Sequence, residues 1–285
     1  MTITSETVKL LRDKTGAGMM DCKKALEVSE GDMDKAIEYL RKKGAATAEK
    51  RADRVANQGI IVTKISEGGK RGTAVEINCE TDFVARSENF VTFAVTIAEL
   101  VAEKVPASVD ELLAMPYDAS KTVAVALTEL VGKVGEKLAI RRFEVVNAAS
   151  GLVEAYTHMG SKIGVLVELA AGAPAADLQI LARDIAMQVA AMNPGVVSRE
   201  EVKKEVIDHE LEIYRQVAKN EGKPEQVIDR IANGKLEKYF QEVVLLEQSF
   251  IKDATKTIKD VVEEASKKLN DQITVRRFLR YQLGE

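Results

Sequence analysis

The sequence predicts an α+β protein in which a small helical module precedes two copies of one α+β unit, each built on a three-stranded antiparallel sheet. Two observations predict this class: amphipathic segments separated by glycines in the first 45 residues, and an internal repeat that aligns without a gap. We expect domains at residues 1–55, 56–148 and 149–285, the last carrying an inserted helical hairpin at about 194–248.

The N-terminal module is predicted to be a three-helix bundle. Its apolar residues recur at helical spacing in three stretches, which are separated by Thr15-Gly16-Ala17-Gly18 and by Glu30-Gly31-Asp32. Glycine just past a helix suits a left-handed C-cap, and Asp32 can N-cap the third helix. Residues 41–54 then carry six basic residues, which favours a helical, solvated linker over a phosphate-binding stripe.

The internal repeat pairs residues 59–77 with residues 151–169 at a constant offset of 92. Each copy shows two β-rich runs joined by a turn that contains glycine, which predicts a β-hairpin. Residues 93–102 match residues 181–190 at helical spacing, so a helix should follow each hairpin. A third strand should close each copy, at Ile140-Arg141-Arg142-Phe143 and Val275-Arg276-Arg277-Phe278.

The second copy is longer than the first. The offset rises from 88 to 135 between the last two matches, so about 47 extra residues lie mostly between Pro194 and Ser249. Ser198-Arg199-Glu200-Glu201 predicts a capping box, and Pro224 predicts the start of a second helix. A projecting hairpin cannot bury two apolar stripes, so we expect it to pair with a second copy of the chain; folding onto its own sheet is the alternative.

The two copies differ after the second strand of the hairpin. The first continues as Asn78-Cys79-Glu80-Thr81-Asp82-Phe83-Val84-Ala85-Arg86, whereas the second has the bland stretch at 170–176. Structural residues should recur in a duplication, so the acidic and aromatic loop is a candidate site. Phe83 has an alternative interpretation as a staple that packs the following helix, and Cys79 is expected to be a small buried residue.

Catalytic chemistry is not supported by the sequence. His158 and His209 stand 51 residues apart with no third ligand nearby, and two cysteines cannot form a four-thiolate site. There is no phosphate loop, dinucleotide fingerprint or nucleophile elbow. We therefore expect that the protein is not an enzyme and holds neither a cofactor nor a metal, and that its function is binding or regulation.

Composition narrows the setting. The net charge is −4 over 285 residues, and the thirteen aromatics include no Trp, which argues against direct nucleic-acid binding. The longest uncharged stretch, Ile185 to Ser198, has 14 residues, fewer than the roughly 18 that a membrane span needs. Two cysteines and a start without a basic and apolar leader favour a cytoplasmic protein.

Three long motifs resemble one family. They are Leu11-Arg12 with Thr15-Gly16-Ala17-Gly18-Met19-Met20-Asp21-Cys22-Lys23-Lys24-Ala25-Leu26, then Asn78-Cys79-Glu80-Thr81-Asp82-Phe83-Val84-Ala85, then His158-Met159-Gly160 with Lys162-Ile163-Gly164-Val165-Leu166-Val167. In content and order they resemble bacterial translation elongation factor Ts, the guanine-nucleotide exchange factor for elongation factor Tu. The resemblance implies a ubiquitin-associated-like bundle, a duplicated core and a dimerisation hairpin.

The resemblance also implies site residues and a partner. In that family the stretch matching Thr81, Asp82, Phe83 and Val84 displaces the support of Mg²⁺ in Tu, and the aromatic ring wedges between side chains of the nucleotide domain. By the same resemblance Arg12, Met19 and Met20 would grip that domain and His158 would touch another one. The implied partner is elongation factor Tu, both GDP-bound and nucleotide-free. Many members continue past the Gly-Glu pair found here at 284–285 into a further helix, so a smaller interface is expected.

Two other functions remain open from the sequence. One is a non-exchanging adaptor, whose bundle binds a helix or a ubiquitin-like surface while the hairpin dimerises it. The other is a role in association with RNA, which would show a steep salt dependence of binding.

Overall fold

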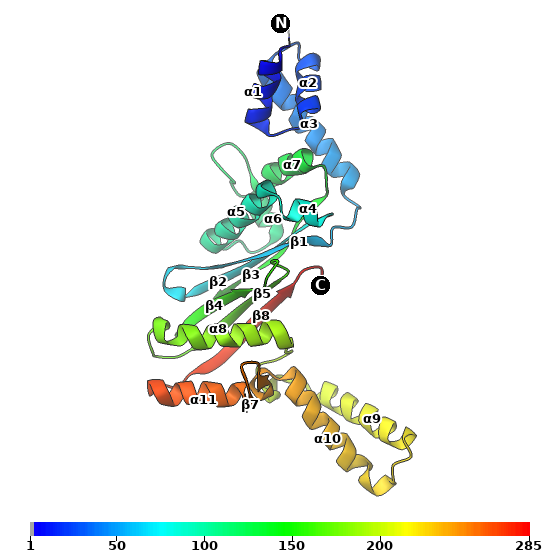
Figure 1. Ribbon diagram of the computed structural model, residues 1–285, viewed down its shortest axis with the longest axis vertical. Helices are drawn as coiled ribbons and strands as arrows, with labels where there is room; N and C mark the ends of the chain where they lie inside the picture. The colour runs from blue at the N-terminus through cyan, green and yellow to red at the C-terminus, as the bar shows by residue number, and fades with distance from the viewer. Residues whose placement is uncertain (1–2) are drawn as a thin grey trace.

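The computed structural model describes residues 3–285, so residues 1 and 2 of the first expected domain lie outside the described part. Two three-stranded antiparallel sheets pack face to face, and helices cover the outer face of each (Figure 1). A helical bundle stands at one end of the molecule, and a helical hairpin projects from the other. The predicted α+β class is confirmed.

The elements follow one another in the expected order. The bundle comprises α1 (Ser5–Thr15), α2 (Met19–Val28) and α3 (Met33–Arg51). The first unit comprises β1 (Gln58–Ile65), η1 (Glu67–Gly69), β2 (Arg71–Cys79), α4 (Asp82–Ala85), α5 (Glu88–Lys104), α6 (Val109–Ala114), α7 (Val123–Val134) and β3 (Leu138–Asn147). The second comprises β4 (Leu152–Thr157), β5 (Ile163–Ala170), α8 (Ala175–Met192), η2 (Arg199–Glu201), α9 (Lys204–Asn220), α10 (Glu225–Val243), η3 (Leu245–Glu247), β6 (Ser249–Phe250), β7 (Asp253–Thr257), α11 (Ile258–Leu269) and β8 (Thr274–Gln282).

The three helices of the bundle end and begin at the glycine and capping residues that the sequence predicts. Gly16 caps α1 in the left-handed region at φ +65°, and the Asp32 carboxylate caps α3 by accepting from the backbone N–H groups of Asp34 and Lys35 at 3.0 Å each. The bundle has a small buried core of its own, made of Val8, Leu11, Cys22, Ala25, Leu26 and Ala36.

The linker prediction is half right. Residues 41–51 are helical, as expected, but they continue α3 and pack along α7 instead of crossing solvent. Gly44 is buried against α7, and Arg41 pairs with Glu129 at 2.9 Å. Arg51 and Arg54 likewise pair with a carboxylate of the core, that of Glu80, whereas Lys42 and Lys43 pair with carboxylates of the bundle itself. The pairing with the core could not be seen in the local charge pattern.

The internal repeat holds in detail. Both sheets have the same antiparallel plan, β1-β2-β3 and β4-β5-β8. Each carries a bulge at the equivalent point, between Glu76 and Ile77 in one sheet and between Glu168 and Leu169 in the other. A bulge adds a residue and bends the strand, so its recurrence at an offset of 92 shows that the two units share backbone geometry as well as sequence.

The contacts between the two sheets are reciprocal. Gly72 lies against the Val153 side chain, and its counterpart Gly164 lies against Ile61, the counterpart of Val153. Neither glycine position has room for a Cβ atom. The core between the sheets contains Ile61, Ala74, Val146, Ala148, Val153, Leu166 and Tyr281. Each unit therefore supplies half of a shared core.

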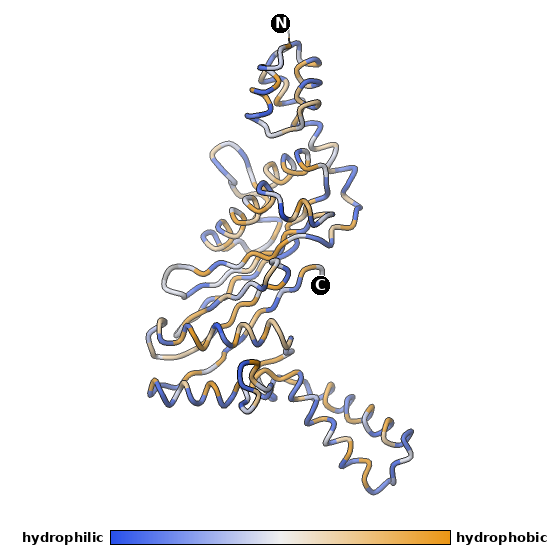
Figure 2. Tube along the Cα trace, in the orientation of Figure 1, coloured by the Kyte–Doolittle hydropathy of each residue, from blue (hydrophilic) through white to orange (hydrophobic). Residues whose placement is uncertain are grey.

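The inserted hairpin projects, so the alternative in which it folds onto its own sheet is wrong. Figure 2 shows hydrophobic and hydrophilic residues alternating along both helices. The face of α9 that carries Ile207, Leu211 and Tyr214 packs towards α10 around Leu236 and Phe240. Val206 and Ile213 lie outside, 38% and 40% exposed.

The predicted capping box at Ser198 is wrong. Ser198 makes no side-chain cap, residues 199–201 form a single 3-10 turn, and α9 begins only at Lys204 because Val202 is extended at ψ 118°. Val196 pairs with Val244, and the Glu201 carboxylate accepts from the Val197 N–H at 3.3 Å. The pairing of this segment with the end of α10 takes precedence over the local helix signal.

Candidate functional site

The loop that differs between the two units, Thr81–Val84, is called the Asp-Phe loop below. It follows β2 and opens the short helix α4, which Thr81 N-caps from an extended backbone at φ −124° and ψ 155°. The Thr81 hydroxyl accepts from the Val84 N–H at 3.4 Å. A capped turn directly after a fully hydrogen-bonded central strand has little conformational freedom.

Glu136, in the connection between α7 and β3, holds the start of this loop. Its carboxylate accepts from the backbone N–H of Thr81 at 3.0 Å and from the Thr81 hydroxyl at 2.6 Å. Two hydrogen bonds to an ionised acceptor are stronger than neutral ones and fix direction as well as distance. The Asp-Phe loop is thus tied to a segment 55 residues further along the chain.

Glu80, the residue directly before the loop, is held in place by three hydrogen bonds. It accepts from the backbone N–H of Lys137 at 2.6 Å, from Arg51 at 2.8 Å and from Arg54 at 3.0 Å. These donors lower its pKa to about 2, the Lys137 N–H being the largest cause. Because Arg51 ends α3, the same carboxylate joins the root of the loop to the long helix of the bundle.

The Phe83 ring is 81% exposed. The interpretation of Phe83 as a staple for the following helix is therefore wrong, and Ala85 and Phe90 fill the buried positions instead. Asp82 pairs with Arg86 one turn later and also remains accessible. Burying an aromatic side chain stabilises a protein more than burying most other side chains does. An aromatic ring that is held exposed on a braced turn therefore indicates a surface that binds a partner.

Cys79, which ends β2, is buried and donates to the Thr81 carbonyl at 3.1 Å. Burial raises the pKa of its thiol to about 12. A thiol held protonated in this way is a poor nucleophile. This supports the prediction that Cys79 is a small structural residue beside the loop.

The structure brings Arg12 of the bundle next to the Asp-Phe loop. A hollow of about 440 Å³ between α1 and α4 is lined by Arg12, Phe83 and Val84, by the glycine loop at 16–18, and by Lys133 of α7. Met19 and Met20 follow directly on Gly18 at the start of α2 and are 47% and 72% exposed. Two elements far apart in sequence therefore line one hollow with a basic and an aromatic side chain, and the exposed Met19 and Met20 follow the glycine loop that forms part of its wall.

His158 lies elsewhere. It is in the turn between β4 and β5, exposed to solvent, with its Nδ1 atom 3.0 Å from the Tyr156 hydroxyl. It does not line the hollow that contains Phe83. The next residue, Met159, is 89% exposed, so this turn offers a second accessible surface.

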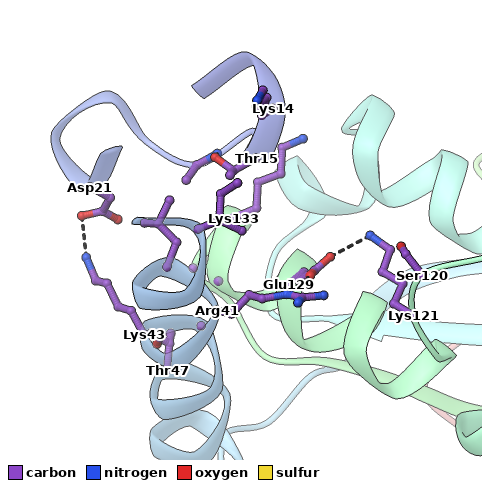
Figure 3. A pocket seen from close by; sticks show the side chains of 16 residues that line it. Lys14, Thr15, Asp21, Arg41, Lys43, Thr47, Ser120, Lys121, Glu129 and Lys133 are labelled. Carbon is purple, nitrogen blue, oxygen red and sulfur yellow. Dashed lines mark hydrogen bonds and ion pairs between the residues drawn. The ribbon is translucent and has the colours of Figure 1, made fainter. Parts of the chain in front are cut away.

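A larger pocket of about 580 Å³ lies between the bundle and α7 (Figure 3). Its two acidic side chains are already paired, Asp21 with Lys43 at 2.5 Å and Glu129 with Lys121 at 2.7 Å. Lys133 lines both this pocket and the hollow beside Phe83. The pocket thus lies at the interface between the bundle and the core, and both of its carboxylates are engaged in ion pairs.

Sequence reasoning missed the residues that support the loop. Lys133, Glu136 and Lys137 belong to no motif, and their only local signal is Gly135, which ends α7 in the left-handed region at φ +73°. Their partners lie more than 40 residues away, so a single sequence does not reveal them.

Within residues 3–285, no group of three or more His, Cys, Asp and Glu side chains is arranged to hold a metal ion. No helix in the same range is long and apolar enough to cross a bilayer.

Comparison with known proteins gives a consistent result. A family model described as Elongation factor TS matches residues 80–285. Elongation factor Ts of Clostridium perfringens (strain SM101 / Type A) is 51% identical over 283 residues, covering 99% of this chain and 93% of that protein. Elongation factor Ts of Chloroherpeton thalassium is 50% identical over 286 residues, covering 99% of each chain. Elongation factor Ts of Chlorobium phaeobacteroides is 51% identical over 286 residues, with the same coverage.

Proposed function

Since the chain belongs to the elongation factor Ts family and is thus a translation elongation factor, we propose that it is a guanine-nucleotide exchange factor. It binds elongation factor Tu in the GDP-bound state, dislodges Mg²⁺ and promotes release of GDP during elongation in the cytoplasm. It acts by binding alone, without a covalent step and without a cofactor of its own.

The physical requirement for such a factor is modest. A GTPase retains GDP through contacts to the phosphates and through Mg²⁺, which bridges phosphate oxygens to protein ligands. A factor that prefers the nucleotide-free state weakens nucleotide binding by the same ratio, because coupling between two ligands is reciprocal. The factor therefore needs a surface that fits Tu only when the Mg²⁺ support has moved.

The exposed Phe83 ring is the observation that carries the proposal. The ring stands on a turn that is capped by Thr81 and braced by Glu136, so little conformational entropy is lost when it inserts into a partner. A rigid ring that enters a packed surface shifts its neighbours discretely, which suits a switch. Asp82 would help by polar contact, and Val84 would extend the apolar part of the surface.

The other site residues contribute affinity in this proposal. Arg12, Met19 and Met20 grip the nucleotide domain of Tu from the bundle, beside the Asp-Phe loop. Methionine side chains adapt to irregular surfaces, and arginine is common at the centres of interfaces. His158, on its separate turn, contacts another domain of Tu.

The test is the release of fluorescent GDP from elongation factor Tu. We expect the wild-type chain to accelerate release, and Phe83→Ala to lower the maximal rate by at least about tenfold, as for a central aromatic residue of an interface. Ile180→Ala is the matched control, because Ile180 is 77% exposed on α8 in the other unit.

Each outcome bears on a different part of the proposal. If the wild-type chain leaves GDP release at its spontaneous rate, the exchange function is wrong, and a chain that binds Tu while GDP is retained would be an adaptor. If Phe83→Ala and Ile180→Ala both exchange at the wild-type rate, the function stands but the Asp-Phe loop is not its site.

A further inference from the structure

We propose that residues Gly132–Lys137, at the end of α7 and in the connection to β3, position both halves of the grip on elongation factor Tu. The first part of this segment seats the bundle, and the second part holds the Asp-Phe loop. The inference rests on the proposed exchange function and names the residues that set the geometry of its site.

Gly132 seats the long helix of the bundle. A Cβ atom built on Gly132 would lie 2.8 Å from the Cα atom of Gly44, so the backbones of α7 and α3 are in direct contact. The bundle packs on the core mainly through α3, since α1 and α2 pack mostly against each other and against α3. The close approach of these two glycines therefore sets how near α3, and with it the bundle, lies to α7.

Lys133 supports the bundle at a second point. Its side chain occupies the space that a Cβ atom at Gly16 would need, and Figure 3 shows it beside the end of α1. Its ammonium group donates to the Asn89 side chain on α5 at 2.6 Å, which keeps the lysine in place. Gly16 begins the glycine loop that leads to Met19 and Met20. Lys133 therefore packs beneath the loop that carries the two methionines assigned to the partner.

The next residues of the segment hold the Asp-Phe loop. Glu136 accepts both hydrogen bonds from Thr81, and the Lys137 N–H donates to Glu80 at 2.6 Å. The Lys137 ammonium group also donates to the carbonyls of Ala52 and Arg54, just beyond the end of α3. Four residues within this six-residue segment thus touch α3, the glycine loop and both ends of the connection between β2 and α4.

Rigid spacing between two binding elements matters for affinity. When two surfaces are held at the span that their partner requires, the second contact forms at a high effective concentration, and this advantage is lost if they cannot engage together. Eight residues of α3 separate Gly44 from Ala36 in the bundle core, a distance of roughly 12 Å at 1.5 Å per residue. A shift of α3 at Gly44 is therefore transmitted along this short helical segment to the bundle.

Two matched substitutions test the first half of the segment. Gly132→Ala places its methyl group against the backbone of α3 at 2.8 Å, so α3 must move. Gly44→Ala is the control on the opposite side of the same contact, because its Cβ atom would meet ordinary distances of 3.4 Å and 3.6 Å. Both exchange a helical glycine for alanine, so their effects on helix propensity match.

Exchange kinetics with fluorescent GDP on elongation factor Tu should separate the two variants. We expect Gly132→Ala to raise the half-maximal concentration about five- to tenfold, with the maximal rate within about twofold of wild type, because the grip loses its second contact and Phe83 is retained. Gly44→Ala should match wild type in both. Equal half-maximal concentrations for the two variants would overturn the proposal.

A double-mutant cycle distinguishes positioning from a general loss of structure. If Gly132 acts by placing the bundle, Arg12→Ala should cost much less in the Gly132→Ala background than in wild type. Additive effects of the two substitutions contradict the inference. For the second half, Glu136→Ala should lower the maximal rate, and Glu136→Gln, which keeps one acceptor for the Thr81 N–H, should restore part of it.

A distance measurement in the free, full-length chain makes the inference independent of exchange activity. Spin labels at Val28→Cys on α2 and Ile180→Cys on α8 report the position of the bundle. We expect Gly132→Ala to shift their distance distribution and Gly44→Ala to leave it unchanged. Unchanged distances in both variants overturn the positioning role even if exchange is active, whereas a shifted distance with no exchange by wild type overturns the proposed function alone.

Discussion

Glu80 shows how one carboxylate can organise several segments. Its side chain is 16% exposed, and its three donors come from α3, from the residues just after α3 and from the residue just before β3. A single exposed salt bridge adds little to the free energy of unfolding. A carboxylate that accepts several hydrogen bonds in a fixed geometry contributes more. Glu80 is therefore a structural support for the neighbouring Asp-Phe loop.

The lowered pKa of Glu80 predicts a pH dependence of stability. The folded state keeps this group ionised down to about pH 2, whereas the ordinary pKa of the carboxyl is 4.5. Its contribution to the free energy of unfolding is thus complete above pH 4.5 and is lost as the pH falls from 4.5 towards 2. We expect wild type to lose stability more steeply than Glu80→Gln in that range, as measured by urea unfolding at a series of pH values.

Glu263→Gln, a substitution of an exposed carboxylate on α11, provides the comparison for that series. It should follow the wild-type curve over the whole range. Parallel curves for wild type and Glu80→Gln would show that Glu80 does not titrate differently in the folded and unfolded states.

At the level of residues, the sequence predicted the candidate loop but not its support. The comparison of the two copies singled out Thr81 to Val84, because a site residue need not recur in a duplicated scaffold. It left Phe83 undecided, since the same residue type serves packing and recognition, and only its exposure separates the two. Glu136 and Lys133 act across long sequence separations, and no local pattern marks such residues.

Among the secondary-structure elements, the hairpins β1-β2 and β4-β5 each depend on a glycine, the second residue of β1 in one and the residue just before β4 in the other. Gly59 has φ +145°, and an added Cβ atom would collide with the Ile77 carbonyl; its counterpart Gly151 has φ +67° and meets the Leu169 carbonyl in the same way. Strand pairing leaves the neighbouring backbone no room to withdraw.

This geometry predicts different costs for two glycine substitutions. Gly59→Ala should lower the free energy of unfolding by about 3 kcal/mol, from backbone strain of roughly 1–2 kcal/mol together with the collision. Gly68→Ala, at φ +79° in the turn between β1 and β2 with open space around it, should cost only about 1 kcal/mol. Urea unfolding measures both, and equal costs would mean that the close approach at Gly59 relaxes freely.

The two helix starts in the second unit show what local signals can determine. Thr257 forms the capping box of α11 with Asp260, and the helix begins directly after this cap, at Ile258. Thr257 also ends β7 and pairs with Ser249, but its N–H remains available to the Asp260 carboxylate, so here the tertiary pairing and the local cap agree on where the helix starts. At Ser198 a similar signal fails, because Val196 and Val197 pair with the segment after α10, and the chain makes only a 3-10 turn at 199–201 before α9 begins at Lys204.

On the scale of the whole molecule, the hairpin α9–α10 extends away from the core and leaves Val206 and Ile213 on its outer face. These two residues are seven apart, so they lie on one side of the helix. We propose a second copy of the chain as their partner and expect Val206→Asp with Ile213→Asp to convert a dimer into a monomer of 31.2 kDa, as measured by light scattering.

The control for this experiment is Ile251→Asp, because Ile251 is 44% exposed but lies outside the hairpin, between β6 and β7. It should leave the mass unchanged. A wild-type chain that is monomeric at all concentrations would exclude the hairpin as a dimer interface.

The reciprocal contact between Gly72 and Val153 and between Gly164 and Ile61 has an evolutionary consequence. Residue i of one unit meets residue j of the other, and j meets i, which is the rule for a two-fold symmetric dimer. A single ancestral unit with this surface would have been self-complementary, and gene fusion would have joined the two subunits of that dimer in one polypeptide. Fusion makes their association independent of protein concentration, and it allows the loop after β2 to diverge from its counterpart after β5 without loss of the shared core.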